Sequence, residues 1–364
     1  MPLIRLVLTL SALACALLSS AAQADLASGF HRRADALLKS HLQKGDFSGV
    51  VLVEHHGKPL LRKGYGLADR ERNMPATPET VFRIGSTTKP FSGAAVMQLV
   101  ERGQVKLDDP IRTYVDGLPS AWSGITVRQL LNHSSGIPDY VQVNGFIRGP
   151  ARMDLTPPEL IALVRDQPLD FAPGARFKYS NTGYALLGMM IERIGGQPYP
   201  DYVRDHLLRP AHLIHTAYDN PEDIVPGRAS GYWLKDGTIQ NARLMTPSTA
   251  YAAGGLRSTV DDLLRWNEAL HSGTILSPGS LATMFTDGGH GYGLGSFVEM
   301  RNGHRFWSHG GNLPGFSCAF EYYPDDDLMV IVLTNIEGEG SERVAKELAG
   351  AYFGWDEVGH RGQP

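Results

Sequence analysis

The sequence predicts an α+β fold of the sandwich type, in which an antiparallel sheet is flanked by helices and a mostly helical lobe is inserted. Strand patterns lie near both ends of the chain, and helical patterns fill the middle. Tight-turn residues join the C-terminal strands, which is typical of antiparallel pairing. One sheet built from both ends accounts for this order. We expect a sheet lobe from about residues 25–85 and 250–355, and a helical lobe from about residues 86–249.

The first 24 residues have the pattern of a cleaved signal peptide. Residues 1–5 carry a positive charge, and the apolar run of residues 6–20 is too short to span a membrane as a mature helix. Ala22-Gln23-Ala24 matches a small-x-small cleavage site. A lipoprotein would need Cys15 at the cleavage point, but Cys15 lies within the apolar run. We therefore expect an exported protein, periplasmic or secreted, with one domain over residues 25–360.

Helical and strand patterns alternate along the N-terminal part. Residues 25–44 place their apolar side chains near one face of a helix. Residues 49–55 form a strand pattern, and residues 59–65 return as its hairpin partner after the turn at residues 56–58.

The middle of the chain is helical and the C-terminal part returns to strands. Helices are predicted at residues 126–132, 156–166, 181–194 and 260–270. Strands are predicted at residues 292–300, 305–309, 315–323 and 328–334, and a closing helix at residues 341–352.

The composition excludes several classes of partner. A formal net charge of −4 gives no reason to expect nucleic acid, and no stretch after the leader is apolar for long enough to insert stably in a membrane. The chain has 13 His but neither a His-Glu-x-x-His motif nor a paired-Cys spacing, so we expect no metal and no other cofactor. After cleavage only Cys318 would remain, so no internal disulfide is expected. The expected partner is a small-molecule or peptide substrate, and the composition favours no particular oligomeric state.

Ser86 and Lys89 are the strongest catalytic candidates. Three residues apart, they share one face of a helical turn, where the lysine can assist deprotonation of the serine. They stand between a short strand pattern at residues 81–85 and a buried helix pattern at residues 91–101, where unpaired N–H groups and the helix dipole favour negative charge. The alternative is an N-cap serine with a solvated lysine. A lysine in the first turn opposes the helix dipole, which counts against this alternative. Pro90 places the start of the helix close to the serine.

Tyr179-Ser180-Asn181 supplies the second candidate element. A tyrosine close to a lysine can have its pKa lowered enough to act as a base. The Asn181 amide can donate to a substrate carbonyl and contact the lysine. An interface tyrosine with a capping asparagine would give the same pattern. The other Tyr-x-Asn, at residues 218–220, precedes Pro221 and is interpreted as a surface turn.

His309-Gly310-Gly311 supplies the third element, at the end of a predicted strand. Adjacent glycines allow a substrate backbone to approach. A histidine there can bind a substrate carboxylate, with its charge appearing near pH 6.5. An ordinary structural histidine is the alternative. Residues 55–57 and 271–273 also combine a histidine with a glycine, but they are interpreted as a hairpin turn and a helix C-terminus.

Ser317 is a rival nucleophile because residues 315–319 approach a Gly-x-Ser-x-Gly motif. That motif requires a strand–turn–helix context. Here the strand pattern continues past the serine, so Ser317 is interpreted as a sheet residue.

Taken in order, the three motifs resemble those of the penicillin-recognising serine hydrolases. These include class C β-lactamases, D-alanyl-D-alanine carboxypeptidases and related esterases. Residues 130–139 resemble the loop that follows the nucleophile in this family, and residues 253–259 resemble its Gly-Gly-Leu-x-Ser-Thr segment. The resemblance covers nearly the whole mature chain. It implies a β-lactamase/transpeptidase-like fold, a site between the two lobes, and a covalent acyl-serine that is then hydrolysed.

The resemblance also implies roles for the site residues. Ser86 would attack, Lys89 would activate it, and Tyr179 would shuttle the proton, since the glutamate that class A enzymes use for deacylation is not apparent. Substrate-binding roles fall to Asn181, His309, Gly310, Gly311 and Asn312, with the N–H groups of Ser86 and Asn312 as the oxyanion hole.

One departure from the family pattern shapes the expected activity. β-Lactamases usually carry Lys-Thr-Gly where this chain has His309-Gly310-Gly311, so we expect weak or no β-lactam hydrolysis. The expected function is a D-alanyl-D-alanine carboxypeptidase-like peptidase or amidase. The alternatives are a carboxylesterase for short-chain esters, and a penicillin-binding or scaffold protein with little turnover.

Overall fold

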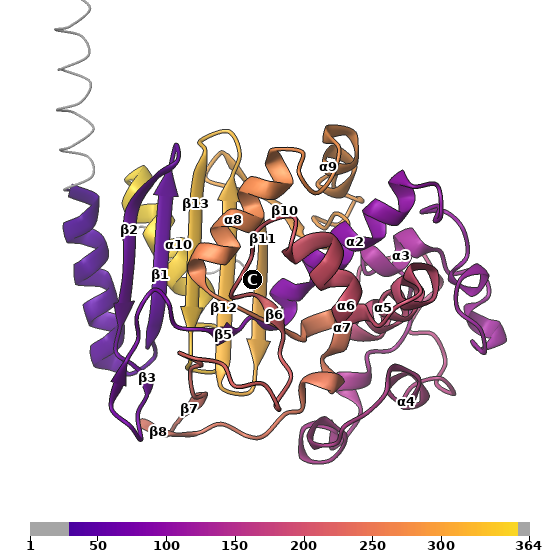
Figure 1. Cartoon of the computed structure of the whole chain (residues 1–364), viewed down its shortest axis with the longest axis horizontal. Coiled ribbons are helices and arrows are strands. Elements are labelled where there is room, and N and C mark those ends of the chain that lie inside the picture. Colours follow the sequence, from indigo (N-terminus) through magenta and orange to yellow (C-terminus); the bar gives the residue numbers. More distant parts are fainter. Residues whose placement is uncertain (1–28, 356–364) are drawn as a thin grey trace, which may run out of the picture.

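The computed structural model of the chain describes residues 29–355 (Figure 1). The predicted signal peptide and the ends of the predicted domain, residues 25–28 and 356–360, lie outside this range. No helix among the described residues combines the length and apolar character needed to cross a membrane.

The predicted α+β fold is confirmed, and its central sheet joins the two ends of the chain. Six strands lie in the order β10-β11-β12-β13-β1-β2, with every neighbouring pair antiparallel. β1 pairs with β13 along its whole length, from Gly49 opposite Thr334 to His55 opposite Leu328. The strands are β1 (Gly49–His55), β2 (Lys58–Tyr65), β10 (Phe297–Arg301), β11 (His304–Leu313), β12 (Phe316–Tyr323) and β13 (Leu328–Thr334).

The central strands β1 and β13 are buried on both faces because almost all of their residues are apolar. In β1, Val50 and Leu52 belong to one core cluster, whereas Val51 and Val53 belong to the other. This alternation is what the two-residue period of a strand requires. The helix at residues 29–44 and α10 (Gly340–Phe353) cover one face, and α8 (Val260–His271) covers the other (Figure 1).

The helical lobe lies beside the sheet and surrounds α2 (Lys89–Glu101), which is buried on all sides over most of its length (Figure 1). The other helices are α3 (Val127–Leu131), α4 (Pro157–Ala162), α5 (Asn181–Gly195), α6 (Tyr199–Val203), α7 (Tyr251–Gly254) and α9 (Pro278–Met284). The predicted helix at residues 156–166 ends early, at Ala162.

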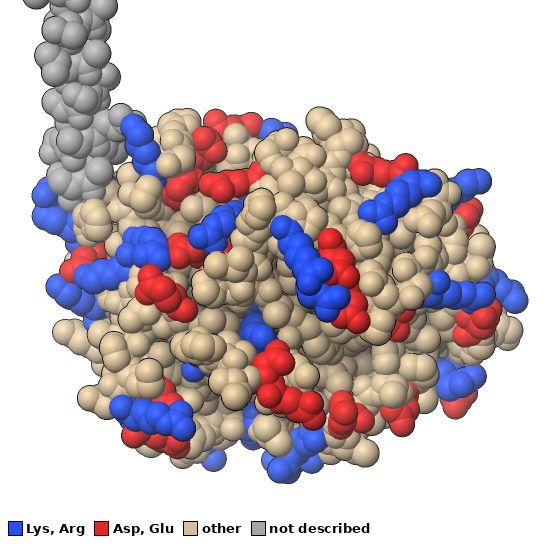
Figure 2. All heavy atoms as spheres, in the orientation of Figure 1, with Lys and Arg blue, Asp and Glu red and all other residues tan. Residues whose placement is uncertain are grey.

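Short strands outside the central sheet complete the fold. They are β3 (Leu67–Asp69), β4 (Met74–Pro75), β5 (Phe82–Arg83), β6 (Ala217–Tyr218), β7 (Tyr232–Lys235), β8 (Thr238–Asn241) and β9 (Leu256–Ser258). β9 lies between β5 and β6 in a three-stranded sheet. Acidic and basic side chains are intermixed over the face seen in Figure 2.

Candidate active site

Ser86 lies in a tight turn between β5 and α2. The turn, Gly85–Thr88, is a 3₁₀ helix, and its Ser86 carbonyl accepts the backbone N–H of Lys89. The predicted strand–helix junction is therefore confirmed, but the α-helix begins at Lys89 rather than at the serine. Gly85 has φ +52°, a left-handed conformation that glycine adopts at little cost.

The Lys89 ammonium group is fully buried and has three hydrogen-bond acceptors. Its Nζ lies 3.0 Å from Ser86 Oγ, 2.9 Å from Asn181 Oδ1 and 2.9 Å from the Ala253 carbonyl oxygen. Three acceptors match the three N–H donors of a charged lysine. When the lysine is neutral, one position becomes a lone pair, and the Ser86 hydroxyl is the only one of these three groups that can donate to it.

Burial controls the charge of Lys89. Desolvation lowers its pKa to about 7, and the negative charge of Asp139 opposes that decrease. The ammonium also lies 4.6 Å from the centre of the Tyr179 ring and 5.2 Å from that of Tyr184. Both protonation states of Lys89 are therefore accessible near neutral pH, as a general base requires.

This pKa predicts how activity depends on pH. Only neutral Lys89 can accept the Ser86 proton, and the neutral form predominates above the pKa. We expect kcat/KM for a neutral ester to fall about tenfold per pH unit below pH 7 and to level off above it. Initial rates between pH 5 and 9 measure this limb, and a limb that persists in Lys89→Met would assign it to another group.

Tyr179 lies beside Ser86 but keeps its proton. Burial raises the pKa of its hydroxyl well above the usual range, and a hydrogen bond with Ser86 offsets only part of that increase. The expectation that a neighbouring lysine would lower this pKa is therefore wrong, because desolvation dominates and raises it. A protonated hydroxyl next to Oγ can still relay a proton, which keeps the predicted shuttle role open.

Two residues that were given no role in the sequence interpretation position the Tyr179–Asn181 segment. His133 accepts the Ser180 N–H at Nδ1 (3.1 Å), and its ring lies 4.2 Å from that of Tyr179. Asp139 accepts the backbone N–H of Asn181 (3.1 Å). The signal was present in the sequence, because both residues stand in the segment 130–139.

The two glycines of the third motif lie within β11 rather than at its end, which corrects the predicted strand boundary. β11 packs directly against the Ser86 turn. A Cβ on Gly311 would overlap the Ile84 carbonyl oxygen and lie 3.1 Å from Ser86 N, and a Cβ on Gly85 would lie 3.1 Å from Asn312 N. This contact places Gly311 and Asn312 of β11 against the Ser86 turn. The role of the Ser86 and Asn312 N–H groups as the oxyanion hole stays a prediction.

His309 is buried, with 2% of its surface exposed. Its Nδ1 donates to the Gly310 carbonyl, so Nε2 accepts from the Tyr292 hydroxyl at 2.9 Å. Burial and the charge of Lys89 lower the pKa of His309 to about 3. The expectation that this histidine gains charge near pH 6.5 is therefore wrong, and its role in substrate binding stays a prediction for the neutral imidazole.

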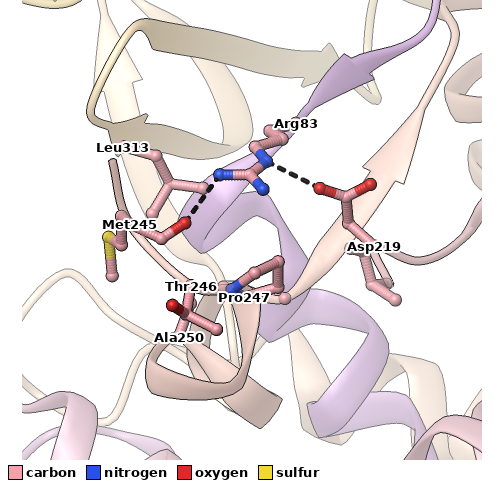
Figure 3. Close-up of a pocket in the computed structure, with 10 residues that line it drawn as sticks. Arg83, Asp219, Met245, Thr246, Pro247, Ala250 and Leu313 are labelled. Carbon is pink, nitrogen blue, oxygen red and sulfur yellow. Dashed lines mark hydrogen bonds and ion pairs between the residues drawn. The ribbon is translucent and has the colours of Figure 1, made fainter. Parts of the chain in front are cut away.

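A small pocket behind the Ser86 turn has a structural role (Figure 3). Arg83 donates to Asp219 (2.6 Å) and to the Met245 carbonyl (3.0 Å) across it. Its volume of about 10 Å³ is close to the room that one water molecule needs. Asp219 is buried, so the predicted surface turn at residues 218–220 is wrong at this position.

The rival nucleophile and the histidines of the two similar motifs have structural surroundings. Ser317 is buried in β12, with its Oγ against Ser341 Oγ. His56 has φ +51° in the β1–β2 turn, and His271 ends α8. Within residues 29–355, no group of three or more His, Cys, Asp or Glu residues is arranged to hold a metal ion.

Comparisons with known proteins agree on the fold. PbpX of Bacillus subtilis is 29% identical over 301 residues, which cover 82% of this chain and 73% of that protein. A penicillin-binding protein homologue from Pyrococcus abyssi, described as octameric, has 30% identity and a TM-score of 0.77, with 89% and 77% of the two chains covered. The D-amino acid amidase of Ochrobactrum anthropi SV3, complexed with D-phenylalanine, has 25% identity and a TM-score of 0.79, with 90% and 99% covered.

The match to a family model extends over almost all of the described residues. The model described as Beta-lactamase matches residues 34–352, which include the Ser86 turn, the Tyr179–Asn181 segment and β11. This extent and the shared fold of the penicillin-binding and amidase structures lead to one conclusion: the chain belongs to the Beta-lactamase family.

Proposed function

We propose that this protein is an exported serine hydrolase that forms an acyl-enzyme on Ser86 and cleaves amides or peptides of D-amino acids. The observation that carries the proposal is the 3.0 Å contact between Ser86 Oγ and a buried lysine whose pKa is about 7. The D-amino acid amidase is among the similar structures, which supports the choice of substrate class.

The geometry supports a two-step reaction. Neutral Lys89 accepts the Ser86 proton as Oγ attacks the substrate carbonyl, and the N–H groups of Ser86 and Asn312 stabilise the oxyanion. The Tyr179 hydroxyl relays a proton to the departing amine, which leaves the acyl group on Oγ. A water molecule then attacks the ester, again with Lys89 as base, and the serine regains its proton.

The charges near β11 favour a neutral leaving group. The imidazole of His309 is uncharged at physiological pH, and both of its nitrogens are already engaged. Behind the strand, a Cβ on Gly310 would overlap the Glu342 carboxylate, so the acidic group touches the strand backbone. A substrate carboxylate would gain no ion pair from His309. An amide or another neutral group therefore fits this side better than the free carboxylate of a D-alanyl-D-alanine peptide.

Short-chain esters are the second candidate substrate. Their leaving groups are also neutral, and aromatic rings gather close to His309: Phe297 at 5.6 Å, Tyr292 at 6.0 Å and Tyr179 at 6.3 Å between ring centres. If the protein hydrolysed no substrate, a penicillin-binding or scaffold role would be favoured instead.

A substrate panel separates these possibilities. The panel contains D-alanyl-D-alanine peptides with a free or an amidated C-terminus, a nitrophenyl acetate and nitrocefin. We expect the amidated peptide to exceed the free acid by about tenfold in kcat/KM, because a carboxylate that finds no partner there loses hydration without compensation. The ratio should stay constant from pH 6 to 8 because His309 does not titrate there. His309→Lys should reduce the difference.

A preference for the free acid that disappears as pH rises through 6.5 would mean that His309 is charged below that pH, which would contradict the proposed neutral imidazole. Covalent labelling by a penicillin without turnover of any substrate would favour the scaffold role. Turnover of the ester alone would favour the esterase.

A further inference from the structure

The carboxylate of Asp139 holds the Asn181 side chain in one orientation. Asp139 is 5% exposed and caps the 3₁₀ turn Tyr140–Gln142. Its Oδ1 accepts the backbone N–H groups of Asn181 (3.1 Å) and Val141 (3.4 Å). Its Oδ2 accepts from Asn181 Nδ2 (3.1 Å).

This contact determines which end of the Asn181 amide faces Lys89. A carboxylate can only accept, so it binds the NH₂ end of the amide and turns the carbonyl end the other way. That carbonyl, Oδ1, lies 2.9 Å from Lys89 Nζ. A continuous chain of hydrogen bonds therefore links Asp139, Asn181, Lys89 and Ser86. If the amide flipped, its NH₂ group would face the lysine and repel the ammonium.

Asp139 is also the acid whose charge favours the ammonium form of Lys89. The two histidines that face the site add no positive charge that would oppose the ammonium, because burial lowers the pKa of each. The titratable groups around Lys89 come from several elements: Asp139 before the turn at residues 140–142, His133 after α3, Tyr179 before α5, Tyr184 on α5 and His309 on β11.

We propose that Asp139 is a positioning residue for acyl transfer, which orients Asn181 toward Lys89 and supplies the negative charge that stabilises the lysine when it carries the serine proton. This inference rests on the proposed role of Ser86 as nucleophile, but not on the identity of the substrate. The residue acts through Asn181 and the electrostatic field, without contact with the reacting atoms.

The test measures the rate of Ser86 labelling by a fluorophosphonate as a function of pH, in wild type and Asp139→Asn. The variant keeps the size of the side chain and removes the charge. We expect the acidic limb to move to lower pH by roughly one unit, since the lost carboxylate no longer raises the pKa of Lys89. The plateau rate should also fall, because the Asn181 amide is then free to flip.

A second variant predicts a shift of opposite sign. The double exchange Asp139→Asn with Asn181→Asp keeps an amide–carboxylate pair but places the charge directly against Lys89. The limb should then move to higher pH. This variant also keeps the inference testable if Asp139→Asn alone does not fold.

The matched control is Asp262→Asn. Asp262 is another buried carboxylate that accepts a backbone N–H, from His215 at 2.7 Å, and it holds Thr216 rather than the site. The Asp262→Asn variant should leave the acidic limb of the labelling rate at the pH of wild type. If neither Asp139 variant moves the limb and their rate losses equal that of Asp262→Asn, Asp139 is merely structural. If wild type is labelled but hydrolyses no substrate, the proposed function fails while this test still stands.

Discussion

Replacing Ser86 with alanine is expected to abolish covalent labelling by fluorophosphonate and to lower ester hydrolysis by about 10⁴-fold or more. The reason is that Oγ is the atom that forms the acyl bond, and Lys89, 3.0 Å away, has no other hydroxyl among its three hydrogen-bond partners. Labelling on a gel and ester hydrolysis on the same preparations measure the two effects, with circular dichroism as the check of folding.

Ser317→Ala is the matched control for that variant. Ser317 Oγ is buried in β12 against Ser341, so its removal should leave labelling unchanged. Labelling that persists in Ser86→Ala and disappears in Ser317→Ala would move the nucleophile to β12 and refute the site described above.

Gly311→Ala is expected to cause the second largest loss. A Cβ at this position would overlap the Ile84 carbonyl oxygen, a backbone atom that cannot move without displacing the Ser86 turn. The displacement would separate the two N–H groups of the oxyanion hole. We expect kcat to fall by about 10²–10³-fold, and the free energy of unfolding to fall by about 1–3 kcal/mol. Steady-state kinetics and urea denaturation measure both.

The neighbouring glycine provides the control. A Cβ on Gly310 points to the opposite side of β11 and would meet the end of the Glu342 side chain, which can move aside. Gly310→Ala should therefore leave the Ser86 turn in place and lose much less activity than Gly311→Ala. Equal losses in the two variants would mean that the strand as a whole, rather than its contact with the Ser86 turn, supports catalysis.

The sequence predicted the parts of the site that depend on local spacing. Ser86 and Lys89 are neighbours along the chain, and one helical turn is enough to bring their side chains together. The sheet was predictable for a similar reason, since β1 and β13 have long apolar strand patterns. The 3₁₀ turn at Ser86 and the early end of α4 depend on packing that local patterns do not encode.

The charge states could not be predicted in this way, because they depend on burial. A histidine at the surface titrates near pH 6.5. His309 is instead buried and hydrogen-bonded to Tyr292, and burial together with the charge of Lys89 lowers its pKa to about 3. Tyr179 shows the same effect in the opposite direction. The role of Asp139 was missed because it requires residues 42 positions apart to meet.

One missed element did have a local signal. The β7–β8 hairpin turns at Asp236-Gly237, and both residues have positive φ, of 49° and 75°. An Asp-Gly pair between two short strand patterns is a strong indication of a tight hairpin.

The most direct test of the acyl-serine mechanism is the intact mass of the protein, quenched in acid during turnover of a nitrophenyl ester or after exposure to a penicillin. We expect a mass increase of one acyl group, located by peptide mapping on Ser86 and absent from Ser86→Ala. Turnover with no covalent adduct at any quench time, or an adduct on a different residue, would contradict it.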